Sequence, residues 1–346
     1  MINDTLLLLR ILGPKPIYTT NVELVKNLSE EKVHELYLHA KINKIGYTYL
    51  RALEDAGIIN RYPTLEKELR EQKEIFNKHR ESLKIISDVL TDLNVAHVFI
   101  KTIYDFPVLP SDIDVLIRDK LSKELIDALR RRGFTPFDKG PHFVSVYNTL
   151  VDPTIPRDKM NYDIDIYDEI SLNYIIYLDK ELCFKNYTED SIHHARVPRP
   201  EYELFIQLNH SVFEHLYTLL HFYTFIKLLS KIEAEEVKKL AKIIRSEKVL
   251  SLTSFITLTI INNVNLNVEK DQPLLLKNFI SKDFAINIKS IPYRYTLTQI
   301  SQVLLEKAKN PTYLYHMLNF MLHLLNPRQF THVTSQILLR RRRESY

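Results

Sequence analysis

The sequence predicts an α+β protein in which a small mixed β-sheet core is flanked by N-terminal and C-terminal helical regions. Short apolar, β-branched runs that suit strands are concentrated in the middle of the chain. Apolar residues at helical spacing dominate before and after that middle part. The length of 346 residues, with 45% hydrophobic and 26% charged residues, is typical of a globular chain with two or three structural units.

Residues 1–92 are predicted to form the N-terminal helical region. Short helices are interrupted by Gly13 and Gly57, which favour turns. A long helix then runs from about Thr64 to about Asp92, because apolar residues follow one stripe along it: Leu65, Leu69, Phe76, Leu83, Ile86 and Leu90.

Residues 93–199 are predicted to form the α+β core. The expected elements, in order, are a strand at 95–100, a strand ending at Ile117, a helix capped by Ser122, a hairpin formed by 134–137 and 142–147, and a strand at 160–167. This order predicts a small mixed sheet backed by helices.

Residues 200–346 are predicted to form a C-terminal helical domain with a basic tail at 340–343. Pro200 suits the first position of a helix that we expect to reach about Ile232. One stripe of this helix is apolar and is expected to be buried, with Phe205, Leu208 and Val212 among its residues.

Composition excludes several classes of protein. The single cysteine, Cys183, excludes an internal disulfide framework and a cysteine-based zinc site. The five glycines form no glycine-rich phosphate loop. No apolar run approaches the ~20 residues of a membrane span, and the first residues lack the features of a signal peptide. We therefore expect a cytoplasmic protein with no membrane partner, and the net charge of +4 permits an anionic partner.

Two Asp-x-Asp motifs carry the functional signal. Asp112 and Asp114 begin one predicted strand, and Asp163 and Asp165 lie in another. Residues i and i+2 of a strand share a face, so each pair points the same way. Clustered carboxylates repel one another unless a cation neutralises them, and Mg²⁺ or Mn²⁺ takes oxygen ligands. We therefore expect neighbouring strands whose carboxylates converge on a metal ion, with a purely structural role for the aspartates as an equal alternative.

The stretch Phe99–Ile117, which reads Phe-Ile-Lys-Thr-Ile-Tyr-Asp-Phe-Pro-Val-Leu-Pro-Ser-Asp-Ile-Asp-Val-Leu-Ile, resembles the signature of the nucleotidyltransferase superfamily with its polymerase-β-like fold. It looks like that of uncharacterised prokaryotic nucleotidyltransferases, and the resemblance extends from about residue 43 to about residue 229. It implies metal-binding and catalytic roles for Asp112, Asp114 and a third aspartate, for which Asp165 fits better than Asp163.

The resemblance also implies a reaction. A nucleoside monophosphate would move from a nucleoside triphosphate, such as ATP, to an acceptor, with release of pyrophosphate. The acceptor is not identified by the sequence and is an RNA, a protein or a small molecule. The oligomeric state and the preferred nucleotide are not indicated either.

Lys101 and Thr102 stand where the superfamily usually has Gly-Ser. We expect these two residues and Ser111 to contact the phosphates of the substrate. On the C-terminal helix, His210 and Glu214 are expected to line the substrate cleft, with a solvated helix face as the alternative. The missing glycine leaves open a non-catalytic nucleotide- or partner-binding module, antitoxin-like or regulatory. The mild positive charge and the basic tail leave open an RNA-binding protein.

Overall fold

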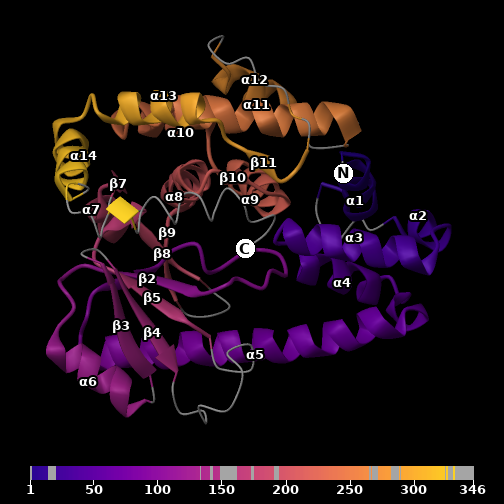
Figure 1. The fold of residues 1–346 in the computed structure, drawn as a ribbon, viewed down its shortest axis with the longest axis horizontal. Helices are drawn as coiled ribbons and strands as arrows, with labels where there is room; N and C mark the ends of the chain where they lie inside the picture. The colour runs from indigo at the N-terminus through magenta and orange to yellow at the C-terminus, as the bar shows by residue number, and fades with distance from the viewer. Residues whose placement is uncertain are drawn as a thin grey trace. The chain divides into compact units, whose positions relative to one another are not determined.

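The computed structural model describes residues 2–14, 21–132, 134–140, 143–148, 162–172, 175–190, 195–264, 266, 272–281, 288, 290–323, 325 and 330–331. Its strands and helices confirm the predicted α+β class (Figure 1). The predicted basic tail lies outside the described residues. Among the described helices, none is long and apolar enough to cross a lipid bilayer.

The chain divides into two compact units. The first, here called the helical unit, contains Met1–Arg70, Tyr104–Val108 and Gln207–Tyr346, and the second, the sheet unit, contains Glu71–Ile103 and Leu109–Ile206. The sequence predicted three consecutive segments with boundaries at 92/93 and 199/200. Packing instead groups most of the first segment with most of the third, and it assigns the long helix from Glu71 onward to the sheet unit.

The sheet unit contains a five-stranded mixed sheet with the strand order β1-β2-β5-β4-β3. Strands β2 and β5 pair in parallel, and the other three pairs are antiparallel. This arrangement confirms the predicted mixed sheet. Its elements are β1 (His97–Phe99), β2 (Ile113–Ile117), α6 (Lys123–Arg131), β3 (Phe134–Gly140), β4 (Phe143–Asn148) and β5 (Ile164–Tyr167). Two hairpins and a short helix follow: β6 (Ile170–Leu172), β7 (Ile175–Leu178), α7 (Lys180–Lys185), β8 (Tyr187–Glu189) and β9 (Arg196–Pro198).

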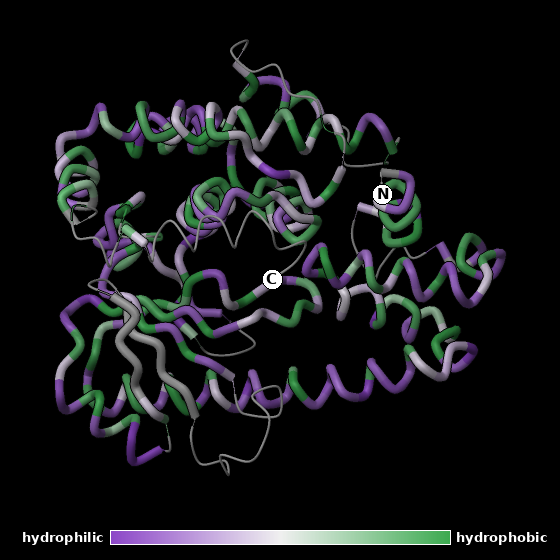
Figure 2. Tube along the Cα trace, in the orientation of Figure 1, coloured by the Kyte–Doolittle hydropathy of each residue, from purple (hydrophilic) through white to green (hydrophobic). Residues whose placement is uncertain are grey.

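One face of this sheet packs on helices. The apolar stripe of α5 (Pro63–Asp92) and the apolar face of α6 form a single core with alternate residues of β2 and β5 (Figure 1). In Figure 2, α5 is mostly hydrophilic with hydrophobic residues at intervals, as expected for a helix that buries one stripe. The core residues include Leu83, Ile86, Leu90, Ile113, Val115, Ile117, Leu125, Leu129, Ile164 and Ile166.

The helical unit contains most of the remaining helices. Its elements are α1 (Ile2–Leu12), α2 (Val22–Lys26), α3 (Glu30–Ile42), α4 (Gly46–Asp55), η1 (Ile59–Arg61), α9 (Leu219–Leu229), α10 (Ala234–Ile243), α11 (Glu247–Val264), α12 (Gln272–Phe279), α13 (Leu297–Lys307), α14 (Pro311–His323) and the strand pair β10 (Leu216–Tyr217) and β11 (Tyr293–Arg294). Helix α8 (Pro200–Phe213) begins in the sheet unit and ends in this one. Its apolar residues Phe205, Leu208 and Val212 are buried, as predicted.

The predicted single helix from Pro200 to Ile232 is wrong, because the chain breaks between α8 and α9. His215 adopts a left-handed backbone conformation with φ of 65°, which ends a right-handed helix. The next two residues form β10 and pair with β11. Thr218 then begins α9, and its backbone N–H donates to Nδ1 of His221 at 3.1 Å. The apolar stripe continues through this break, so periodicity alone did not reveal it.

Two adjacent buried charges at the end of α13 fix the turn between α10 and α11. The carboxylate of Glu306 accepts hydrogen bonds from the first two backbone N–H groups of α11, at 3.1 and 2.9 Å. Nζ of Lys307 donates to the carbonyl oxygen of Ile244, which follows α10, at 2.9 Å. The negative charge at a helix N-terminus and the positive charge at a C-terminus both complement the helix dipoles. Burial lowers the pKa of Lys307 to about 7, and nearby Glu306 acts against this shift.

We expect Lys307 to make the protein more stable as the pH rises above neutrality. Its pKa of about 7 in the folded protein lies below the ordinary value of 10.5. Between these values the unfolded chain holds a proton that the folded chain lacks, so the free energy of unfolding increases with pH. Urea denaturation across this range should show a smaller increase for Lys307→Met than for the wild type. Lys309→Met, which removes an exposed lysine two residues away, should behave like the wild type. If the unfolding free energy of Lys307→Met rises with pH as steeply as that of the wild type, the prediction is wrong.

Candidate metal centre

The parallel pairing of β2 and β5 positions two aspartates side by side. Asp114 is the direct partner of Asp165 in the register of the two strands. The backbone N–H of Ile113 donates to the carbonyl oxygen of Asp163 at 2.9 Å and extends this pairing by one residue. Since side chains alternate along a strand, Asp114 and Asp165 leave the face opposite to the core isoleucines. This confirms that the two acidic strands are neighbours in one sheet.

Three carboxylates converge on this face. Asp112, Asp114 and Asp165 each offer a carboxylate oxygen, and these oxygens all lie within 4.8 Å of one another. Asp114 and Asp165 are 5% and 4% exposed, whereas Asp112 is half-buried. Asp163 is exposed and does not join the group. The structure therefore selects Asp165 as the third carboxylate, a choice that the sequence left open.

The electrostatic setting of Asp114 suits a cation. Burial raises the pKa of this carboxyl to about 7; nearby Lys101 opposes the shift, and the carboxylates of Asp112 and Asp165 add to it. Its Oδ1 atom is buried and makes no hydrogen bond to the described part of the chain. Buried polar atoms of this kind need a partner. The three carboxylates and this unsatisfied oxygen together fit a hard divalent cation such as Mg²⁺ or Mn²⁺.

Lys101 lies within this site. Its Nζ is 3.1 Å from Oδ2 of Asp114 and 5.3 Å from the centre of the Tyr167 ring. The side chain is buried. Burial acts against the charge, but Asp114, Tyr177 and Asp112 together raise the pKa of Lys101 above its ordinary value. Lys101 therefore carries an ammonium that partly neutralises the triad.

The backbone of Lys101 is held in an unusual conformation. Its φ of 52° lies in the left-handed region, which favours glycine. The backbone N–H donates to Oε1 of Glu203, a residue of α8, at 3.0 Å. Lys101 therefore has a backbone conformation that favours glycine, at the position where the nucleotidyltransferase superfamily usually has a glycine.

Thr102 and Ser111 have different roles from each other. The Thr102 hydroxyl is buried; it donates to the carbonyl oxygen of Ile100 and accepts the backbone N–H of Asp114, both at 2.9 Å. The Thr102 hydroxyl fixes the backbone of Asp114, and the predicted contact of Thr102 with phosphate stays a prediction. Ser111 is exposed, and its hydroxyl donates to Oδ1 of Asp112 at 3.0 Å. Ser111 thus lies beside the triad, and its contact with a phosphate stays a prediction.

His210 and Glu214 form a separate cluster in the helical unit. Oε1 of Glu214 is 3.2 Å from Nε2 of His210, and its other oxygen is 3.7 Å from Nζ of Lys44. Burial opposes the ionisation of Glu214, but Lys44 and His210 outweigh it and hold its pKa well below the ordinary value. The two side chains are 15% and 13% exposed, which does not fit the alternative of a solvated helix face. Their contact with a substrate stays a prediction.

Sequence reasoning missed two residues of the site, Glu203 and Tyr167. Tyr167 follows Asp165 by two positions on β5 and therefore shares its face, so the strand period could have identified it. Glu203 lies about a hundred residues after Lys101, and no local pattern links the two. That pairing depends on how α8 packs in the sheet unit.

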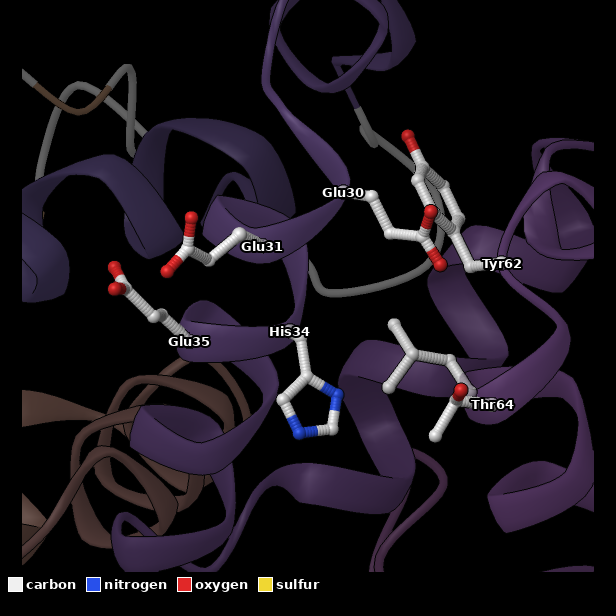
Figure 3. Close-up of a pocket in the computed structure, with 7 residues that line it drawn as sticks. Glu30, Glu31, His34, Glu35, Tyr62 and Thr64 are labelled. Carbon is white, nitrogen blue, oxygen red and sulfur yellow. The ribbon is translucent and has the colours of Figure 1, made fainter.

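The helical unit contains a cavity of about 460 Å³ with an acidic lining. Figure 3 shows Glu31 and Glu35 side by side, with His34 between these two residues and Thr64. Among the described residues, the triad is the group of three or more acidic, histidine or cysteine side chains whose ligand atoms lie close enough together to share a cation, and the lining of this cavity does not belong to it. Its labelled residues are Glu30, Glu31, His34, Glu35, Tyr62 and Thr64.

Comparisons of the chain with protein-family models, with curated proteins and with solved structures gave no match. The assignment of the site therefore depends on three features of the molecule itself. These are the parallel register of β2 and β5, the convergence of three carboxylates, and the unsatisfied oxygen of Asp114.

We expect Asp114→Asn and Asp112→Asn to differ in stability when no metal is present. Asp114→Asn leaves the buried ammonium of Lys101 without its closest counter-charge and should cost roughly 3 kcal/mol of unfolding free energy. Asp112→Asn relieves repulsion among the carboxylates, so its stability should hold or rise. Chemical denaturation in the presence of EDTA measures both. Equal stability of the two variants would show that the Lys101–Asp114 pair contributes nothing.

Proposed function

We propose that the chain is a metal-dependent nucleotidyltransferase, which moves a nucleoside monophosphate from a nucleoside triphosphate to an acceptor and releases pyrophosphate. The observation that carries this proposal is the convergence of Asp112, Asp114 and Asp165 on two adjacent parallel strands. A bound Mg²⁺ or Mn²⁺ supplies positive charge that stabilises a phosphoryl group during transfer. The resemblance of residues 99–117 to the superfamily signature supports nucleotidyl transfer among the reactions that such a centre can serve.

In this proposal the chain positions the cation and moves one proton. Asp112 and Asp114 hold the cation. A hydroxyl or phosphate oxygen of the acceptor bonds to the α-phosphorus as the bond to the pyrophosphate oxygen breaks. Asp165 either accepts the proton of an acceptor hydroxyl or serves as a further cation ligand. Lys101 and the exposed hydroxyl of Ser111 contact phosphate oxygens.

A second candidate function is a non-catalytic nucleotide- or partner-binding module, favoured by the ion pair between Lys101 and Asp114. The ammonium already compensates one of the three carboxylates, which reduces the need of the fold for a cation at this point. A module of this kind would bind a nucleotide without the help of a metal. The two functions therefore differ in the metal dependence of nucleotide binding.

Nucleotide binding should depend on divalent metal and on the triad. Calorimetry with ATP should show at least roughly tenfold tighter binding with Mg²⁺ than with EDTA, because the cation bridges carboxylates and phosphates. Asp112→Asn should lose this gain. Asp163→Asn removes the same charge from an exposed neighbour outside the triad and should keep it. Equal, weak binding with and without Mg²⁺ would favour the non-catalytic module.

Transfer activity should require all three carboxylates. The substitutions Asp112→Asn, Asp114→Asn and Asp165→Asn should each lower the rate of transfer by several orders of magnitude. An amide oxygen is a poor substitute for an anionic ligand of the cation. The measurement is transfer of a radiolabelled nucleotide to pools of RNA, protein and small molecules. The Asp163→Asn variant should retain full activity. Folded triad variants that keep transfer would exclude the assignment.

A further inference from the structure

Lys101 places a positive charge where a metal ion would also act. Its ammonium lies 3.1 Å from Oδ2 of Asp114, and both side chains are less than a tenth exposed. The carboxylates of Asp112 and Asp165 are near enough to influence the same group of charges. With every group ionised, three carboxylates and one ammonium give −3 + 1 = −2, which is the charge that a single divalent cation balances.

The position of this ammonium is fixed by its surroundings. The left-handed backbone of Lys101 is unfavourable for a residue with a side chain and persists only where neighbouring groups hold it. Glu203 holds it from the backbone side through the hydrogen bond to the N–H. Thr102 fixes the adjoining strand by bonding the backbone of Asp114. Asp114 and the ring of Tyr167 surround the ammonium itself.

We propose that Lys101 is a tethered counter-ion of the triad, which competes with a divalent cation for Asp114 and transfers its ammonium to the phosphates of the nucleotide when the cation binds. The first part concerns cation binding alone, whereas the second rests on the proposed function.

The competition follows from charge and space. A cation held by Asp114 would lie within a few ångströms of the ammonium, in a buried setting where like charges repel more strongly than in water. Oδ2 of Asp114 is engaged by Lys101, and Oδ1 is the oxygen that remains without a hydrogen bond among the described residues. Without a nucleotide, the triad should therefore bind a divalent cation weakly. An anionic triphosphate gives the ammonium a new partner and releases the full carboxylate, so cation and nucleotide should bind cooperatively.

The test measures the dissociation constant of Mn²⁺ by electron paramagnetic resonance, with no nucleotide present. Lys101→Met should bind Mn²⁺ at least roughly tenfold more tightly than the wild type. Lys123→Met removes the same charge from an exposed position at the start of α6. Because solvent and salt screen that site, this control should match the wild type. Lys101→Gln, whose amide can still hydrogen-bond Asp114, takes the place of the Met variant should the latter fail to fold.

A second measurement uses a non-hydrolysable ATP analogue with saturating Mn²⁺. Here the Lys101 variants should bind at least roughly tenfold more weakly than the wild type, because the phosphates lose the ammonium. Opposite changes in the two affinities identify a counter-ion that changes partners, since general damage to the site would weaken both. This inference is overturned if a folded Lys101 variant binds Mn²⁺ no more tightly than the wild type. If the wild type binds Mn²⁺ and Asp112→Asn does not, the proposed function is left intact by that result. If neither the wild type nor any folded variant binds Mn²⁺, with or without the analogue, this inference and the proposed function are both overturned.

Discussion

The in-register parallel pairing of β2 and β5 is the constraint on which the rest of the site depends. It makes Asp114 and Asp165 direct partners and buries Ile113, Val115, Ile164 and Ile166 against the helices on the other face. A slip of one residue would turn the isoleucines toward the site and Asp165 into the core. Burial of apolar surface therefore enforces the convergence of the carboxylates, and the same period of two residues that stabilises the core also builds the candidate metal centre.

Two groups of buried ionisable side chains differ in how well their partners satisfy them. Glu306 and Lys307 are each satisfied by the ends of neighbouring helices, so their hydrogen bonds fix the connection between α10 and α11. The triad instead gathers like charges, and one buried oxygen of Asp114 has no hydrogen bond among the described residues. The ammonium of Lys101 reduces this repulsion, and the backbone of the same residue is held in a strained, left-handed conformation. Strain and unsatisfied charge at one point are features of a site that a ligand completes.

Local patterns predicted much of the sheet unit, and long-range pairings set the limits of prediction. The α+β class, the capped helix at Ser122 and the Asp-x-Asp strand follow from spacing and composition. The choice of Asp165 over Asp163, the hydrogen bond from Lys101 to Glu203 and the grouping of the two chain ends in one unit depend on contacts between distant segments. The break at His215 was missed for another reason: a left-handed residue and a two-residue strand interrupt the helix without disturbing its apolar stripe.

The Lys-Thr pair after β1 changes what this corner of the sheet can offer a phosphate. The N–H of Lys101 is used by Glu203, and the Thr102 hydroxyl is used by the backbone of Asp114. A glycine at the first position would bring backbone donors close to a ligand, whereas here those donors serve the protein. The ammonium of Lys101 and the hydroxyl of Ser111 instead contact Asp114 and Asp112 beside the triad. Phosphate binding at this site should therefore depend on side chains and a cation to a greater degree than in a site built around a glycine turn.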